Sequence, residues 1–111
     1  MNKVVLITGG ARGIGSAIAL ELAKHGYDIV INYLTSKQPA KELKEKIESQ
    51  YHVRCLTICA DVSDVDQVNI MVSEIEEKMG GVDVLINNAA VDLSNLFHLK
   101  NAEEFKRTLD V

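Results

Sequence analysis

The sequence lacks three features that would place it in particular classes of protein: a basic cluster, a long apolar run and a set of cysteines. Its 111 residues hold 12 Lys and Arg against 16 Asp and Glu, a formal net charge of -4. Nucleic-acid binding needs clustered Lys and Arg that neutralise phosphates, so we expect no nucleic-acid partner. No apolar run approaches the roughly 18 residues of a membrane span, and the run at residues 4–7 is too short for a signal peptide. We therefore expect a cytoplasmic protein with no membrane contact.

Only two cysteines occur, and they lie in one apolar stretch. In a strand, Cys55 and Cys59 would share a face but lie about 13 Å apart, whereas a disulfide needs Cα atoms within roughly 7 Å of each other. No second pair at matching spacing completes a zinc site, and the three histidines share no motif. We predict two small, buried core residues and no metal site.

Apolar runs alternate with helical patterns along the chain. Runs rich in Val and Ile are typical of strands buried on both faces of a parallel sheet. Four such runs occur, at residues 4–7, 29–31, 53–60 and 82–86. Helical patterns follow them at residues 14–25, 39–50 and 63–79, and a fourth begins near Asn101. The order β-α-β-α-β-α-β-α predicts an α/β fold, with right-handed crossovers that place helices on both faces of a parallel sheet.

The third helical pattern is the clearest of these. Ser63 and Asp66 resemble a capping box with Asp in place of Glu, so Ser63 is the predicted N-cap. A stripe spaced by three and four residues indicates a helix that packs against the sheet. The stripe consists of Val65, Val68, Val72, Ile75 and Met79.

A glycine-rich turn follows the first apolar run directly, as Thr8-Gly9-Gly10-Ala11-Arg12-Gly13-Ile14-Gly15. Such a turn lets the backbone approach a pyrophosphate, and the helix after it supplies free N–H groups and a positive dipole end. Gly9 suits the tight turn, Gly13 the close approach and Gly15 the packing of helix on strand. We predict a Rossmann-type fold of three α/β/α layers that binds a dinucleotide. The alternative is a tight loop without a ligand, because the spacing G-x-x-x-G-x-G is neither G-x-G-x-x-G nor a P-loop.

Further motifs come at the ends of the third and fourth apolar runs, as Asp61-Val62 and Asn87-Asn88-Ala89-Ala90. With Thr-Gly-x-x-x-Gly-Ile-Gly and the closing Leu109-Asp110-Val111, they resemble the short-chain dehydrogenase/reductase family in order and position. The resemblance covers the whole chain and implies an oxidoreductase. One departure is Ala90, where the family has Gly, and a Cβ there makes the geometry of that turn less certain.

The resemblance implies roles at the matching positions. The pyrophosphate would lie against the three glycines, near the Ile14 amide. Asp61 would hydrogen-bond the adenine amino group beside the backbone of Val62, although a helix-flanking acid is the alternative reading of this residue. Asn87 would stabilise the sheet and border the adenosine ribose, and Ala89 would line the cofactor path.

Charge at the end of the second strand bears on the choice of cofactor. An NAD site usually offers an acid there, about 20 residues past the glycines, to the ribose 2′-OH. Asn32 and Tyr33 hold that place without a charge, so a 2′-phosphate would not be repelled. Arg12 is expected to pair with that phosphate, with Ser36 and Lys37 as secondary candidates, unless Arg12 is simply an exposed turn residue. We predict NADP as the cofactor and NAD as the less favoured one.

The family's reaction is hydride transfer between a nicotinamide and a carbonyl or alcohol carbon, assisted by a Ser and a Tyr-x-x-x-Lys motif. The one matching letter pattern, Tyr33-x-x-x-Lys37, falls at the adenosine end and cannot reach the nicotinamide. We therefore assign no catalytic residue. The resemblance implies that residues 1–111 are an NAD(P)-binding Rossmann domain truncated before its catalytic half, and that this chain alone is inactive.

Three accounts of the chain stay open. The first is a fragment of a reductase for a small-molecule or acyl-carrier-bound carbonyl substrate, because residues 31–33, Arg12 and residues 94–97 look most like 3-oxoacyl-(acyl-carrier-protein) reductases. Such enzymes are usually tetramers, so a homo-oligomer is implied. The second is a nucleotide-binding module without catalysis. The third is an interaction module that recruits a partner through an exposed sheet edge at residues 82–86.

Overall fold

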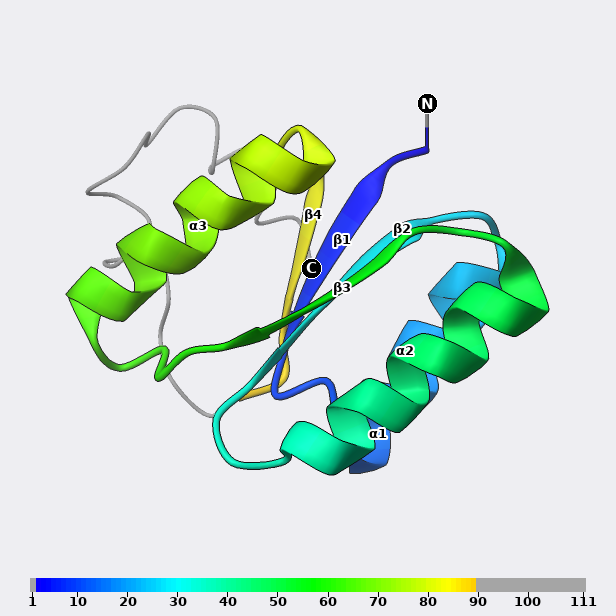
Figure 1. Cartoon of the computed structure of the whole chain (residues 1–111), viewed down its shortest axis with the longest axis horizontal. Helices are drawn as coiled ribbons and strands as arrows, with labels where there is room; N and C mark the ends of the chain where they lie inside the picture. Colours follow the sequence, from blue (N-terminus) through cyan, green and yellow to red (C-terminus); the bar gives the residue numbers. More distant parts are fainter. Residues whose placement is uncertain (1, 90–111) are drawn as a thin grey trace.

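Four parallel strands form a sheet with helices on both faces in the computed structural model, which describes residues 2–89 (Figure 1). The strands are β1 (Val4–Thr8), β2 (Asp28–Tyr33), β3 (Cys55–Cys59) and β4 (Val84–Asn87). The helices are α1 (Gly13–Lys24), α2 (Lys37–Tyr51) and α3 (Val65–Met79). The order across the sheet is β3-β2-β1-β4, and every pairing is parallel. The predicted α/β fold is confirmed; the helix expected near Asn101 lies outside the described residues.

The continuous apolar run of β1 is explained by its position in the sheet. β1 pairs with β2 on one side and β4 on the other, and all five of its residues are buried. Leu6 faces the core under α3, whereas Ile7 faces the core under α1 and α2. Full burial of each such side chain contributes about 1.5–3 kcal/mol, so both faces of this strand stabilise the fold.

Helices α2 and α3 each bury an apolar face against the sheet. In α2 the buried residues are Ala40, Leu43 and Ile47, and they pack with α1 on one side of the sheet. On the other side α3 buries a longer stripe, which differs from the predicted one in that Met71 belongs to it and Val65 is only half-buried. The buried residues of α3 are Val68, Met71, Val72, Ile75 and Met79.

The start of α3 differs from the sequence prediction. Its N-cap is Asp64, whose Oδ1 accepts hydrogen bonds from the amides of Asp66 at 2.9 Å and Gln67 at 3.3 Å. The predicted cap at Ser63 is wrong because its amide and hydroxyl both donate to the Asp61 carboxylate instead. The preceding acid therefore moves the cap one residue along the chain.

The two cysteines have different surroundings. Both thiols are free. Cys55 is buried as predicted, and burial raises the pKa of its thiol to about 12. The predicted burial of Cys59 is wrong, since this residue ends β3 at the sheet edge and is exposed. Cys59 is therefore accessible to solvent, and Cys55 is held as a neutral core residue.

The start of β2 is fixed by a buried carboxylate. Asp28 Oδ1 accepts from the Arg54 amide at 2.9 Å and from Asn2 Nδ2 at 3.2 Å, while Oδ2 accepts from the Arg54 guanidinium at 2.7 and 2.8 Å. Burial raises the pKa of Asp28, but these hydrogen bonds outweigh it and hold the pKa below its ordinary value. Asp28 thus joins the starts of β1, β2 and β3 and lies far from the strand ends considered next.

None of the helices within residues 2–89 is long and apolar enough to cross a bilayer. Within the same residues, no three His, Cys, Asp or Glu side chains gather around a common point that a metal ion could occupy.

Candidate functional site

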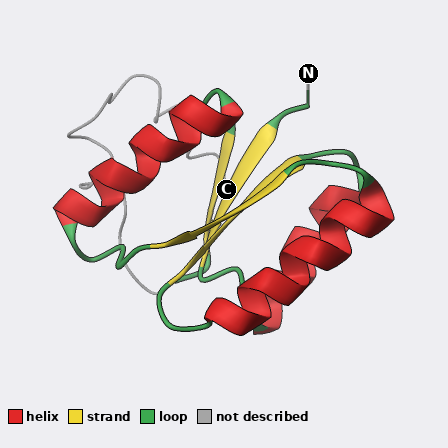
Figure 2. Cartoon of the chain, viewed as in Figure 1, coloured by secondary structure: helices red, strands yellow, loops and turns green. Residues whose placement is uncertain are grey.

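The carboxyl ends of the four parallel strands meet at one edge of the sheet, here called the carboxyl edge. In open α/β sheets, ligands bind in the crevice outside this edge. Figure 2 shows the loops that follow β1 and β2 close together there. The structure therefore brings four segments with predicted site residues to one edge: the glycine turn, the end of β2 with the loop after it, Asp61-Val62 and residues 87–89.

The glycines of the turn are required for two different reasons. Gly9 has φ +62° and Gly13 has φ +58°, a left-handed conformation in which a side chain is strained. Gly15 is instead in α1, where a Cβ would lie 2.6 Å from the Gly9 carbonyl oxygen and 2.8 Å from Gly10 Cα. Gly15 therefore allows the helix to pack directly on the turn, whereas nothing lies within 4 Å of a Cβ at Gly13.

The N-terminus of α1 is open. Arg12 occupies the N-cap position with extended backbone, makes no side-chain cap bond, and no acid lies in the first turn. The Ser16 amide donates to the Arg12 carbonyl at 3.3 Å. No bond within the described part of the chain satisfies the amides of Gly13, Ile14 and Gly15. These amides and the helix dipole form a place for an anion, and the exposed Ile14 lies beside it.

A hollow of about 100 Å³ lies between the glycine turn and the β2–α2 loop. We call it the turn hollow, and Arg12 carries the only charge among its lining residues. Like α1, α2 begins with an N-cap residue, Ser36, that makes no side-chain cap bond, and its first turn contains no acid. The hollow is lined by Gly9, Ala11, Arg12, Tyr33, Leu34, Thr35 and Ser36.

Sequence reasoning found part of this lining. It named Gly9, Arg12, Tyr33 and Ser36 as cofactor-binding residues. It missed Ala11, Leu34 and Thr35, which lie between named residues and had no role of their own in a motif. Lys37, the other secondary candidate, does not line the hollow. It is exposed, and its amide donates to the Thr35 carbonyl at 3.0 Å.

Asn32 lies beneath the turn and is buried. Its Oδ1 accepts from the Gly9 amide at 3.3 Å, and its Nδ2 donates to the Ala60 carbonyl at 3.0 Å. Its own carbonyl accepts from the Gly10 amide at 3.1 Å. The sequence predicts Asn32 as a cofactor-binding residue. In the structure its side chain bonds to the backbone of Gly9 and of Ala60.

The loop after β4 is tied to the glycine turn through Thr8. The buried Thr8 hydroxyl donates to Asn87 Oδ1 and accepts from the amides of Asn88 and Ala89, each at 3.1 Å. Asn88 Nδ2 donates to the Gly9 carbonyl at 3.0 Å. Sequence analysis gave no role to Asn88, although its place beside Asn87 was a signal. The predicted residues Asn87 and Ala89 therefore border the turn; Ala90 lies outside the described residues.

Asp61 begins the loop after β3. Its Oδ1 accepts from the Ser63 hydroxyl at 2.6 Å and from the Ser63 amide at 2.9 Å, and these bonds lower the pKa of Asp61. Within the described chain Oδ2 has no partner and is free to accept from a ligand. The carboxylate thus flanks α3 and keeps one acceptor available, while the neighbouring Val62 side chain is buried in the core under α3.

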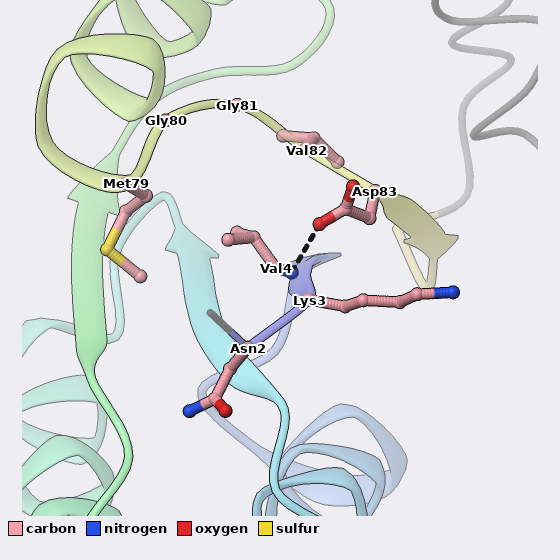
Figure 3. A pocket seen from close by; sticks show the side chains of 8 residues that line it. All are labelled: Asn2, Lys3, Val4, Met79, Gly80, Gly81, Val82 and Asp83. Atoms are coloured by element: carbon pink, nitrogen blue, oxygen red, sulfur yellow. Dashed lines mark hydrogen bonds between the residues drawn. The ribbon is translucent and has the colours of Figure 1, made fainter.

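A larger hollow, of about 310 Å³, lies at the opposite end of the strands and is lined by residues 2–4 and 79–83 (Figure 3). We call it the amino-edge hollow. Val4 and Asp83 pair across it: the Val4 amide donates to Asp83 Oδ2, and the Asp83 amide donates to the Val4 carbonyl, each at 2.8 Å. The Asp83 carboxylate therefore holds β1 to the chain before β4. We place the candidate site at the carboxyl edge instead.

Known proteins resemble this chain over most of its length. A family model described as short chain dehydrogenase matches residues 3–111. The chain is 39% identical over 110 residues to the 3-oxoacyl-(acyl-carrier-protein) reductase of Staphylococcus aureus strain N315, which covers 99% of this chain and 44% of that protein. It is 44% identical over 88 residues to general stress protein 39 of Bacillus subtilis, with 79% and 30% covered. The chain spans less than half the length of these curated relatives.

Solved structures agree with this match. L-sorbose reductase from Gluconobacter frateurii, complexed with NADPH and L-sorbose, gives a TM-score of 0.75 at 34% identity and covers 81% of this chain and 34% of that one. An alcohol dehydrogenase from the archaeon Thermococcus sibiricus, complexed with 5-hydroxy-NADP, gives 0.71 at 32% identity, with 77% and 36% covered. The strand order, the glycine turn at the carboxyl edge and these matches lead to one conclusion: the chain belongs to the short chain dehydrogenase family.

Proposed function

We propose that this chain is the cofactor-binding N-terminal part of an NADP-dependent reductase of this oxidoreductase family. The observation that carries the proposal is the turn hollow, in which Arg12 is the only charged lining residue and the uncapped end of α2 contributes Ser36. The Arg12 cation and the Ser36 hydroxyl favour a phosphate, and no lining carboxylate repels it. The hollow is therefore assigned to the 2′-phosphate that distinguishes NADP from NAD.

The neighbouring segments fit the rest of the cofactor. The free amides of Gly13 and Ile14 at the start of α1 would hold the pyrophosphate. Asp61 would accept from the adenine amino group through Oδ2, since Oδ1 is occupied by Ser63. Ala89 would border the path toward the nicotinamide. When bound, NADPH supplies the hydride; the described residues bind and orient it.

The substrate proposal rests on the relatives. The S. aureus relative is a 3-oxoacyl-(acyl-carrier-protein) reductase, and two of the similar solved structures are complexes with NADPH and with 5-hydroxy-NADP. We propose reduction of a carbonyl on a small molecule or an acyl carrier, in a cytoplasmic homo-oligomer. The family's Ser and Tyr-x-x-x-Lys have no counterpart placed for catalysis in residues 1–111, so catalysis would require further residues.

A substitution at Arg12 tests the proposal. Arg12→Ala removes the charge from the turn hollow, and a hydrogen bond to a charged group contributes about 1.5–3 kcal/mol. We expect NADPH affinity to fall by about 10- to 100-fold and NADH affinity to stay unchanged, measured by isothermal titration calorimetry on the protein at its full natural length. Lys41→Ala, which removes an exposed positive charge from α2, is the matched control. Wild-type protein that binds NADPH no more tightly than NADH would overturn the proposal.

The same preparation separates the reductase from the non-catalytic alternative. Oxidation of NADPH in the presence of a 3-oxoacyl or other carbonyl substrate supports the reductase. Tight NADPH binding without turnover of any carbonyl substrate supports a nucleotide-binding module.

A further inference from the structure

Asn32, in β2, joins two segments that the cofactor would contact, the glycine turn and the loop after β3. It is the fifth of the six residues of β2 and is 3% exposed. Its side chain accepts from the Gly9 amide and donates to the Ala60 carbonyl, and its carbonyl accepts from the Gly10 amide. The Asn32 side chain therefore bonds both to the glycine turn and to the residue that follows β3.

The three bonds reach two parts of the proposed site. Two go to the glycine turn, which would hold the pyrophosphate. The third goes to Ala60, the residue before Asp61, whose carboxylate would hold the adenine. One residue further along β2, Tyr33 lines the turn hollow. This arrangement depends on the strand order β3-β2-β1, which places β2 between the strands that carry the other two segments.

The carboxamide is chemically suited to this position. It offers an acceptor and a donor on separate atoms, whereas a carboxylate offers only acceptors and a hydroxyl has a single, shorter-reaching atom. Loss of the side chain would leave the Gly9 amide and the buried Ala60 carbonyl without these partners. We propose that Asn32 is a positioning residue that fixes the pyrophosphate and adenine segments relative to one another; this inference rests on the proposed function.

The role predicts a distinctive pattern of affinity. Because Asn32 would act on the segments that NADPH and NADH share, Asn32→Ala should weaken both cofactors by the same factor, about tenfold. Arg12→Ala, in contrast, should weaken NADPH alone. A residue that only stabilises the fold would lower the melting temperature without changing the affinity of molecules that stay folded.

The experiment measures both affinities by isothermal titration calorimetry, on the protein at its full natural length, for wild type, Asn32→Ala and Ile75→Val. The Ile75 variant is the control, because this side chain of α3 is fully buried in the apolar core and lines neither the glycine turn nor the turn hollow. Measurements are made where circular dichroism shows all three proteins folded, and melting temperatures are recorded. We expect Asn32→Ala to lose affinity for both cofactors equally and Ile75→Val to lose none.

Several outcomes would overturn the inference. The inference is wrong if Asn32→Ala binds both cofactors as tightly as wild type, or if it loses affinity for NADPH alone. It is also wrong if Ile75→Val loses as much affinity as Asn32→Ala. If Asn32→Ala does not fold, Asn32→Ser replaces it. The serine hydroxyl can bond to at most one of the two partners, so we expect a smaller loss of affinity that is equal for both cofactors. Unchanged affinity in Asn32→Ser would overturn the inference. Wild-type protein that binds neither cofactor would overturn the proposed function itself, which keeps the two failures distinct.

Discussion

Gly15 is a position where helix propensity and packing predict opposite effects on stability. It lies in the first turn of α1, where alanine would be favoured over glycine by about 1 kcal/mol from propensity alone. A Cβ there would lie 2.6 Å from the Gly9 carbonyl oxygen and 2.8 Å from Gly10 Cα, both under the 3.0 Å that real contacts essentially never cross. Both atoms are backbone, so relief requires the turn to move.

The turn is not free to move. The Gly9 carbonyl accepts from Asn88, and the Gly9 and Gly10 amides donate to Asn32. Overpacking costs about 1–3 kcal/mol, and displacing the Asn88 hydrogen bond adds about 1 kcal/mol. After the propensity gain is set against these costs, we expect Gly15→Ala to lower the free energy of unfolding by about 2 kcal/mol.

Urea unfolding followed by circular dichroism measures this change. Gly13→Ala is the comparison, since its Cβ meets nothing within 4 Å and its cost of about 1 kcal/mol comes from the positive φ alone. Gly15→Ala should therefore be the more destabilising of the two. A Gly15→Ala protein as stable as wild type, or more stable, would refute the close packing of α1 on the turn.

Two further predictions concern the amino ends of the strands and the cysteines. The folded-state pKa of Asp28 is lowered, so its contribution to stability should be complete above its ordinary pKa of 3.8 and be lost as the pH falls through and below that value. Asp28→Asn should accordingly be about 2 kcal/mol less stable at pH 7, and the gap in urea unfolding should close below about pH 4; a gap that is independent of pH would contradict the role given to this carboxylate. In native protein, iodoacetamide should modify the exposed Cys59 and leave the buried Cys55, whose pKa is raised to about 12, unmodified until denaturant is added. Peptide mapping by mass spectrometry reads both residues, and native labelling of Cys55 would show that β3 is not held as described.

The strands and the glycine turn could be predicted because their signals are local. Val4 to Ile7 is a continuous apolar run, which only a strand buried on both faces explains well. The glycines at 9, 13 and 15 follow it at once. Cys59 was misjudged because β3 lies at the sheet edge, and strand order is not written in a single run of residues.

The connections beneath the site could not be predicted, because they join residues distant in sequence. Asn32 bonds to Gly9 and Ala60, which are 23 and 28 residues away. Asn88 reaches Gly9 across 79 residues. The cap of α3 depended on a local competition: Asp61 takes both donors of Ser63, so the helix begins one residue later than the capping pattern indicated.

The central claim is that a dinucleotide binds at the carboxyl edge with its 2′-phosphate in the turn hollow. Amide chemical shifts of isotope-labelled protein, followed during separate titrations with NADPH and NADH, test it most directly. We expect both cofactors to shift the amides of Gly13 and Ile14, and NADPH alone to shift those of Thr35 and Ser36 strongly. Identical shifts from the two cofactors in the turn hollow, or shifts confined to residues 79–83 around the amino-edge hollow, would contradict the account.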